Sequence, residues 1–138
     1  MYEQLKLDHQ ICFPLYALSK EITRRYTPFL AKLDLTYPQY LVMLVLWECD
    51  GQTVNQIGAK LHLDSGTLTP LLKRLQAKEL IKRERSQEDE RVVQVFLTPS
   101  GKDLADEACT IPEQMAQCLN LEASEVALLR KIVGKLAG

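Results

Sequence analysis

The sequence predicts a mainly α-helical chain with one small β-hairpin. Apolar residues recur at steps of three and four over most of the 138 residues, which is the repeat of one helix face. Two β-rich runs, 80–85 and 91–97, interrupt this repeat, and a charged five-residue turn joins them into an expected hairpin. The length fits one globular domain, or one domain with a dimerisation element, and excludes most multidomain enzymes.

The N-terminal part is expected to form a long helix over residues 7–33, whose apolar face includes Ile11 and Leu15. Pro14 complicates its start, because proline is best tolerated in the first turn of a helix. The helix therefore either begins near Cys12 or is kinked there. After a break at 34–38, residues 39–48 are too densely apolar for a surface helix and are expected to be buried.

Two short helices are expected next. The first covers residues 54–61, with Thr53 as its N-cap, and three residues separate it from the second, which covers 65–78 and is capped by Asp64 or Ser65. The pattern of the second helix assigns its side chains to two faces: Leu68, Leu71, Leu72 and Leu75 point inward, and Lys73, Arg74 and Lys78 point toward solvent.

Beyond the hairpin, Thr98 followed by Pro99 predicts the start of a helix that runs to about Leu119. A last helix over 122–136 carries one apolar stripe. These helices and the N-terminal one have more apolar surface than the small unit between them can cover. We therefore expect the N- and C-terminal helices to form a dimer interface.

A short helix, a three-residue turn, a second helix and a basic hairpin, in this order, are typical of a winged helix-turn-helix. In such a unit the second helix enters the major groove of DNA, and the hairpin can reach the adjacent minor groove. We expect residues 1–36 to form the N-terminal dimerisation helix, 37–98 the DNA-binding domain and 99–138 the C-terminal dimerisation helices. The candidate DNA-contacting residues are Ser65, Thr67, Thr69, Pro70, Lys73, Arg74, Arg83, Arg85, Asp89 and Arg91.

The net charge of -1 alone argues against a nucleic-acid-binding protein. Its distribution changes that interpretation, because residues 60–91 hold eight basic and six acidic side chains and the rest of the chain carries -3. This modest basic surplus predicts weak non-specific attraction to DNA. Affinity should then depend on a two-fold dimer that engages two half-sites of a palindromic operator.

The stretch LDSGTLTPLLKRL at 63–75, followed by KRER at 82–85 and DER at 89–91, resembles the recognition helix and wing of the MarR family of transcriptional regulators. The resemblance extends from Leu5 to about Leu119 and is strongest to the OhrR-type branch, which senses organic hydroperoxides. It implies a homodimer built from the first and last helices. It also implies that Asp89 orients Arg91 toward the minor groove.

Cys12 is the candidate redox-sensing residue. It lies near a helix start, where the partial positive charge of the helix favours a thiolate, although a cysteine on an apolar helix face is often only a small core residue. The resemblance implies that Tyr26 and Tyr37 donate hydrogen bonds to this cysteine across the dimer. Tyr16, one turn from Cys12, is a candidate for a further wall of the pocket. An apolar lining from Phe13, Met43 and Trp47 would favour organic hydroperoxides.

Attack of the thiolate on a hydroperoxide converts Cys12 to a sulfenic acid and releases an alcohol. A second thiol can then form a disulfide, and the resulting helix displacement would release DNA. The resemblance favours Cys118 as this resolving cysteine and leaves Cys109 or a small external thiol as alternatives. Cys49 is expected to lie in the core.

The sequence therefore indicates a redox-sensing regulator, which we expect to be a repressor. The alternative is a MarR-type repressor that a phenolic or apolar ligand releases without covalent chemistry. A metal site at His9 and Cys12 lacks further ligands, and a peroxidase lacks a thioredoxin-like pattern, so we expect no metal, no cofactor and no enzyme. The polar N-terminus and the short apolar run at 40–47 predict a cytoplasmic protein without a membrane partner.

Overall fold

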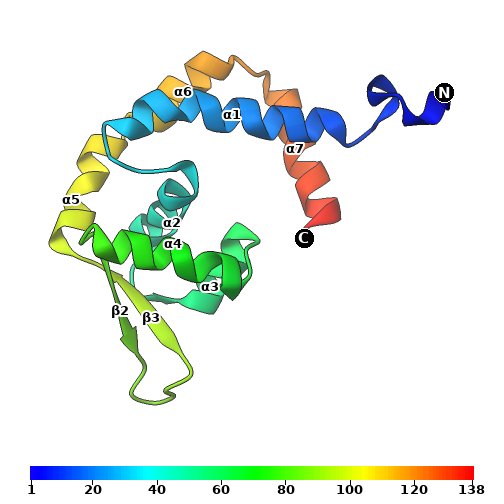
Figure 1. Cartoon of the computed structure of the whole chain (residues 1–138). Helices are drawn as coiled ribbons and strands as arrows, with labels where there is room; N and C mark the ends of the chain where they lie inside the picture. Colours follow the sequence, from blue (N-terminus) through cyan, green and yellow to red (C-terminus); the bar gives the residue numbers. More distant parts are fainter. The chain divides into compact units, whose positions relative to one another are not determined.

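The computed structural model describes all 138 residues, which form two compact units, Met1–Tyr37 and Pro38–Gly138. The first unit contains two 3₁₀ turns, η1 (Glu3–Leu5) and η2 (Leu7–His9), followed by the helix α1 (Phe13–Ala31) (Figure 1). The boundary expected between the DNA-binding domain and the C-terminal helices falls inside the second unit, and that division stays a prediction.

Helix α1 begins later than the predicted helix over 7–33. Cys12 is its N-cap residue and Pro14 lies in its first turn, where the missing N–H leaves no helical hydrogen bond unmade. The preceding residues fold back in 3₁₀ turns, which the side chain of Gln10 stabilises by donating to the carbonyl oxygens of Gln4 (3.0 Å) and Lys6 (2.8 Å). Of the two starts that the sequence allows, the one near Cys12 is correct.

The second unit contains seven elements from α2 to α5 and two further helices at its C-terminal end. They are α2 (Tyr37–Glu48), β1 (Gln52–Thr53), α3 (Val54–Leu61), α4 (Ser65–Ala77), β2 (Ile81–Arg85), β3 (Val93–Leu97), α5 (Pro99–Ala108), α6 (Ile111–Leu119) and α7 (Ala123–Leu136). The bounds of α3, α4 and the hairpin agree closely with the prediction. None of the helices is both long and apolar enough to cross a membrane.

The hairpin belongs to a three-stranded antiparallel sheet with the order β1-β3-β2. The register pairs Arg83 with Val95 in the hairpin and pairs Gln52 of β1 with Val95 on its other side. Strand β1 was not predicted, because two residues are too short to show alternation. It ties the hairpin to the start of α3, where Thr53 both ends β1 and caps the helix through a hydrogen bond from the Gln56 backbone (3.1 Å).

The core of the second unit lies between α2, α3, α4 and the sheet. Helix α4 packs against α3 and β2 through one face, on which Leu68, Leu72 and Leu75 are completely buried. The expectation that residues 39–48 are buried is confirmed for most of α2, including Met43, which has no exposed surface. Met43 is therefore a core residue.

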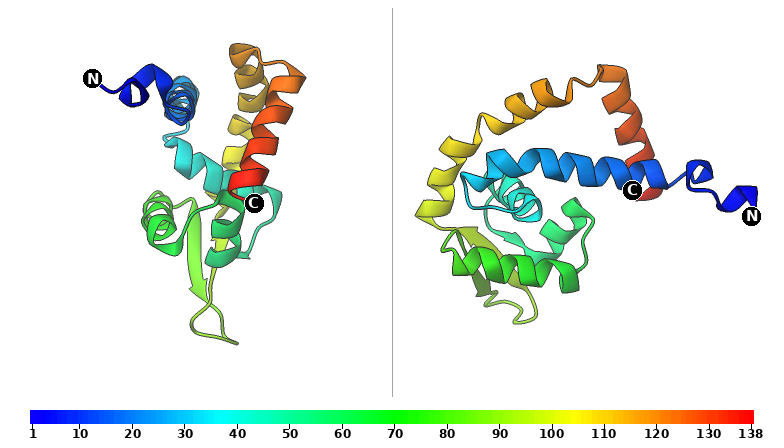
Figure 2. Two further views of the ribbon diagram at one scale, coloured as in Figure 1. Left: turned by 90° about the vertical axis from the view of Figure 1, so that its right-hand side faces the viewer. Right: turned by 45° about the horizontal axis from the view of Figure 1, so that its top comes forward.

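Two features of this unit differ from the prediction. Cys49 is exposed, because α2 ends at Glu48 and the cysteine lies in the turn beyond it. The expected helix over 98–119 is divided at Cys109 and Thr110 into α5 and α6, since Pro112 starts a new first turn. After α6, Asn120 adopts a left-handed conformation (φ 48°) and the chain reverses into α7 (Figure 2).

Each unit keeps a large apolar surface uncovered. Helix α7 has no buried residue, and it exposes Leu128, Val133 and Leu136. The N-terminal unit also exposes large apolar side chains along its 3₁₀ turns and the first half of α1. They are Tyr2, Leu5, Leu7, Ile11, Phe13, Leu15, Tyr16 and Leu18. Exposed apolar patches of this kind are typical of protein–protein interfaces.

The junction between the hairpin and α5 is closely packed. Thr98 donates from its hydroxyl to the carbonyl oxygen of Glu79 (2.7 Å) and from its backbone N–H to that of Leu80 (3.1 Å). Gly101 lies directly against the Leu80 carbonyl, where an added Cβ would collide with the oxygen, and its own carbonyl accepts a hydrogen bond from the indole Nε1 of Trp47 (2.9 Å). Only glycine fits this position without movement of the backbone.

This packing predicts opposite effects for two glycine substitutions. Gly101→Ala should lower the free energy of unfolding by about 1–3 kcal/mol, because the Leu80 backbone has to move. Gly134→Ala is the matched control. In the single chain no atom outside the backbone of its own helix lies within 4 Å of its Cβ position, so alanine should raise the free energy of unfolding by about 0.5–1 kcal/mol.

Urea denaturation at one fixed protein concentration measures both free energies. Equal stability of the two variants would contradict the close approach at Gly101.

Candidate functional site

The N-terminus of α4 is held by a charged cap. The Asp64 carboxylate accepts a hydrogen bond from the Thr67 backbone N–H (2.7 Å), and this bond lowers the pKa of Asp64 below its ordinary value. A carboxylate at this end also complements the helix dipole. The core-facing leucines then direct the rest of α4 outward: Ser65, Thr67, Pro70, Lys73 and Arg74 are exposed, and Thr69 is half-buried.

The tip of the hairpin is ordered by Asp89. Its carboxylate accepts from the backbone N–H of Arg91 (3.0 Å) and from the guanidinium Nε (3.2 Å) and Nη2 (3.3 Å) of the same residue. These bonds lower the pKa of Asp89, while the Arg91 side chain stays 91% exposed. The side-chain pair is thus in contact, and the arginine keeps most of its surface for a partner.

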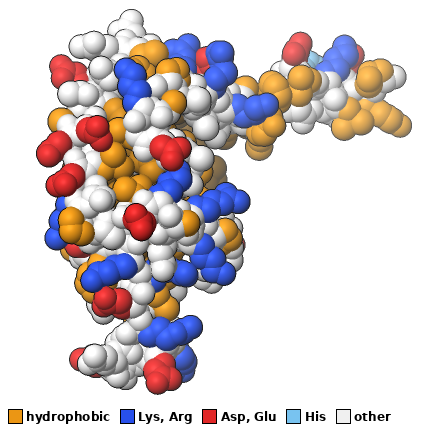
Figure 3. Space-filling model, turned by 60° about the vertical axis from the view of Figure 1, so that its left-hand side comes forward, with side chains coloured by type: hydrophobic (Ala, Val, Ile, Leu, Met, Phe, Trp, Pro, Cys, Tyr) orange, Lys and Arg blue, Asp and Glu red, His pale blue; other side chains and the backbone are white.

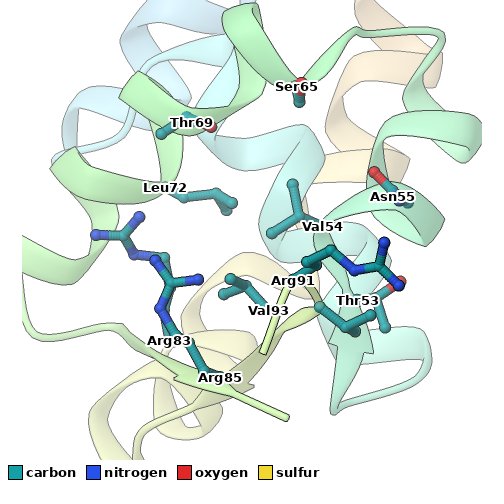
Figure 4. A pocket seen from close by; sticks show the side chains of 11 residues that line it. Thr53, Val54, Asn55, Ser65, Thr69, Leu72, Arg83, Arg85, Arg91 and Val93 are labelled. Carbon is teal, nitrogen blue, oxygen red and sulfur yellow. The ribbon is translucent and has the colours of Figure 1, made fainter. Parts of the chain in front are cut away.

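Helices α3 and α4 and the hairpin enclose a hollow of about 380 Å³ (Figure 4). Ser65 and Thr69 lie on its α4 side, Arg83 and Arg85 on its β2 side, and Arg91 across from them. Sequence reasoning named these five residues but missed two polar neighbours from the start of α3, Thr53 and Asn55. The sequence signal that could have identified them is their position at the start of a capped helix.

Two of the predicted DNA-contacting arginines of the hairpin also donate hydrogen bonds to other residues of the chain. Arg83 donates from Nε to the side-chain oxygen of Gln76 on α4 (2.7 Å), and Arg85 donates from Nη1 to the carbonyl oxygen of Glu90 (2.8 Å). The first bond links the hairpin to α4. Lysine and arginine side chains lie along the hairpin, with acidic ones beside them at its tip (Figure 3).

The prediction that Lys78 faces solvent is wrong. It is half-buried at the C-terminal end of α4 and donates from Nζ to the side-chain oxygen of Gln39 on α2 (2.9 Å), a residue that is only 2% exposed. The helical periodicity of the sequence predicted that Lys78, like Lys73 and Arg74, points toward solvent. The helix ends at this residue, with Glu79 in a left-handed conformation (φ 62°), so the lysine turns toward α2 instead.

The candidate sensing cysteine lies in the first unit. Cys12 is exposed, and its carbonyl oxygen accepts the first backbone hydrogen bond of α1, from Tyr16 (3.2 Å). The rings of Tyr16 and Phe13 are 6.3 Å apart, and Lys20 Nζ lies 5.4 Å from the centre of the Tyr16 ring. Aromatic and cationic side chains therefore lie in contact along the first turns of the helix that follows Cys12.

The two other candidate tyrosines form a pair. The ring centres of Tyr26 and Tyr37 are 4.7 Å apart, and burial raises the pKa of Tyr37, so its phenol stays protonated and able to donate a hydrogen bond. Fourteen residues of α1 separate Tyr26 from Cys12, which is about 21 Å along a helix axis and too far for side chains to bridge. The pair cannot reach the cysteine of its own chain.

All four cysteines are exposed, and none forms a disulfide. Cys109 lies between α5 and α6 and donates from Sγ to the carbonyl oxygen of Asp106 (3.2 Å), while Cys118 lies in the last turn of α6. No group of three or more His, Cys, Asp or Glu side chains could hold a metal ion.

The chain is similar to known regulators over most of its length. A family model described as "Transcriptional regulator SarA/Rot" matches residues 24–108. The "Organic hydroperoxide resistance transcriptional regulator" of Bacillus subtilis is 52% identical over 111 residues, which cover 80% of this chain and 76% of that protein.

The structural matches agree with these relatives. The overoxidized form of AbfR bound to DNA, a protein of Staphylococcus epidermidis, is 39% identical with a TM-score of 0.80, and the match covers 97% of this chain and 95% of that one. A disulfide form of AbfR is 38% identical with a TM-score of 0.69, covering 99% and 96%. The chain therefore belongs to the SarA/Rot family of transcriptional regulators, within the MarR-type winged-helix proteins that include the organic hydroperoxide resistance regulators.

Proposed function

We propose that this protein is a redox-sensing transcriptional repressor that binds a palindromic operator as a homodimer and releases it when an organic hydroperoxide or a related oxidant oxidises Cys12. The observation that carries the proposal is the combination of two features in one chain. The first is a winged helix-turn-helix whose wing presents Arg91 on an Asp89 carboxylate. The second is an exposed cysteine at the start of the first helix.

The DNA-binding surface is formed by α4 and the wing. Exposed Ser65 and Thr67 at the start of α4 suit base edges and phosphates in the major groove, and Lys73 and Arg74 suit the backbone. Thr69, Pro70, Arg83 and Arg85 complete this surface between the helix and the wing, and Arg91 suits the narrow minor groove. DNA-bound structures of AbfR, a protein with the same fold, support this assignment.

The homodimer brings the sensing residues together. The exposed apolar surfaces of α1 and α7 supply an interface, and a second copy can place Tyr26 and Tyr37 beside Cys12, which their own chain cannot do. Two protonated phenols would stabilise a thiolate by hydrogen bonding, and Tyr16 would line the same pocket. A two-fold dimer also presents two α4 helices to successive turns of the operator.

Oxidation then proceeds in two steps. The Cys12 thiolate attacks the terminal peroxide oxygen, the O–O bond breaks, and the products are Cys12 sulfenic acid and, after protonation, the alcohol. The thiol of Cys118 in the partner subunit then attacks the sulfenic sulfur, which forms a disulfide and releases water. The disulfide form of AbfR, which belongs to that protein, supports this second step.

The DNA-binding assignment predicts a loss of affinity for Arg91→Ala. The dissociation constant for the operator should rise about tenfold, because the minor-groove contact is lost, and the salt dependence of binding should decrease. Lys102→Ala, which removes the same charge from an exposed position on α5, should leave affinity unchanged. Fluorescence anisotropy with an operator duplex selected from a random library measures both; equal affinities of the two variants would refute the role of Arg91.

The sensing assignment predicts that Cys12→Ser still binds the operator but stays bound after treatment with cumene hydroperoxide. Cys49→Ser is the matched control, since this thiol is also exposed but lies outside the sensing region, and it should be released like the unmodified protein. Mobility-shift assays measure release. Release of Cys12→Ser by peroxide would disprove the mechanism, and its release by a non-oxidising phenol would favour a non-covalent effector.

The resolving assignment predicts a covalent dimer linked from Cys12 to Cys118. Non-reducing mass analysis of the oxidised protein should show this dimer in Cys109→Ser and not in Cys118→Ser. The opposite pattern would identify Cys109 as the resolving residue. No covalent dimer in the unmodified protein would leave the role to a small external thiol.

A further inference from the structure

Helix α2 makes side-chain hydrogen bonds to neighbouring elements of the second unit at both of its ends. In its first turn Gln39 accepts from Lys78 at the end of α4 (2.9 Å), and in its last turn Trp47 donates to the carbonyl oxygen of Gly101 at the start of α5 (2.9 Å). Just beyond the helix, the Asp50 carboxylate accepts from the backbone N–H of Leu97 in β3 (2.8 Å). A displacement of α2 must therefore either move these elements or break the bonds.

The Gln39–Lys78 bond lies close in sequence to Tyr37, one of the two proposed sensing tyrosines. Tyr37 is the first residue of α2, and Gln39 follows two residues later in the same turn. Gln39 is almost completely buried, so its side chain cannot follow a movement of the helix by swinging into water. Lys78 caps the C-terminal end of α4, the helix whose other end carries Ser65 and Thr69.

We propose that Lys78 is a positioning residue that couples the sensor to the recognition helix through Gln39. This inference rests on the proposed redox function and concerns how the signal travels. Conversion of the Cys12 thiolate to sulfenic acid or disulfide removes the anionic acceptor of the tyrosine hydroxyls. The first turn of α2 shifts, and the Gln39–Lys78 bond carries this shift to the end of α4, so the helix turns away from its half-site.

The geometry favours coupling because the bond joins two rigid elements at their ends. A shift applied at the end of a 13-residue helix alters the direction of its whole axis, whereas a shift applied at its middle mainly translates it. Both groups in the bond are shielded from bulk water: the ammonium group of Lys78 is half-buried and the amide of Gln39 is buried. Such charge-assisted bonds are stronger and more directional than exposed ones.

A bond that merely holds α4 in place can be distinguished from one that transmits a signal. Loss of a purely structural bond changes operator affinity by the same factor in the reduced and oxidised states. Loss of a coupling bond changes the ratio of the two affinities, because that ratio is the coupling itself. The test therefore compares, between variants, the ratio of operator affinity in the reduced state to that in the oxidised state.

The experiment measures operator dissociation constants before and after cumene hydroperoxide, with the duplex selected from a random library by the unmodified protein. Intact mass analysis verifies that Cys12 is oxidised to the same extent in every variant. Lys78→Met removes the donor while keeping the length of the side chain, and Lys78→Arg restores a donor. Lys73→Met removes an exposed lysine from the same helix as a matched control.

Lys78→Met should bind the operator when reduced within about threefold of the unmodified protein, while its loss of affinity on oxidation should shrink by about tenfold, within the usual range of coupling. Lys78→Arg should regain the response. Lys73→Met should weaken both states equally. A response of Lys78→Met equal to that of the unmodified protein would overturn the inference.

A second variant covers the case in which Lys78→Met loses DNA binding altogether. If Gln39→Met also loses binding in the reduced state, the bond positions α4 in every state and the coupling role is refuted. If Gln39→Met binds when reduced and fails to respond, the inference holds. Absence of release in the unmodified protein would instead refute the proposed redox function.

Discussion

The DNA-facing surface depends on the burial of one face of α4. Leu68, Leu72 and Leu75 are completely buried, and their spacing fixes the rotation of the helix about its axis. Each fully buried leucine contributes about 1.5–3 kcal/mol of hydrophobic stabilisation, far more than an exposed charge pair, so this rotation is strongly preferred. The outward direction of Ser65 and Lys73 follows from it.

Polar interactions then set details that the hydrophobic core leaves free. Hydrogen bonds lower the pKa of Asp64 and of Asp89, so both carboxylates are charged at neutral pH, and their contribution is lost only as the pH falls through these lowered values. The helix cap and the orientation of Arg91 are consequently insensitive to pH in the neutral range. A change in thiol chemistry can thus act on DNA binding without interference from titration of these groups.

Sequence patterns predicted the parts of the fold that local rules determine. Helical periodicity with a capping residue gave α3 and α4, and alternation around a charged turn gave the hairpin. The exposure of Cys49, the break near Cys109 and the two-residue strand β1 were missed, because each depends on where a neighbouring element ends. The Gln39–Lys78 bond was missed for a related reason: it joins residues 39 positions apart, and no local pattern contains it.

In the proposed sensor, a single chain cannot bring the tyrosines to the thiol. About 21 Å of helix lies between Cys12 and Tyr26, and the rigidity of α1 keeps them apart in any one copy. In the proposed dimer, the groups that activate the thiol come from one subunit and the thiol from the other. The interface that assembles the sensor is then the same interface that sets the spacing of the two recognition helices. Because DNA binding depends on that spacing, a change at the thiol acts directly on the geometry that the operator requires.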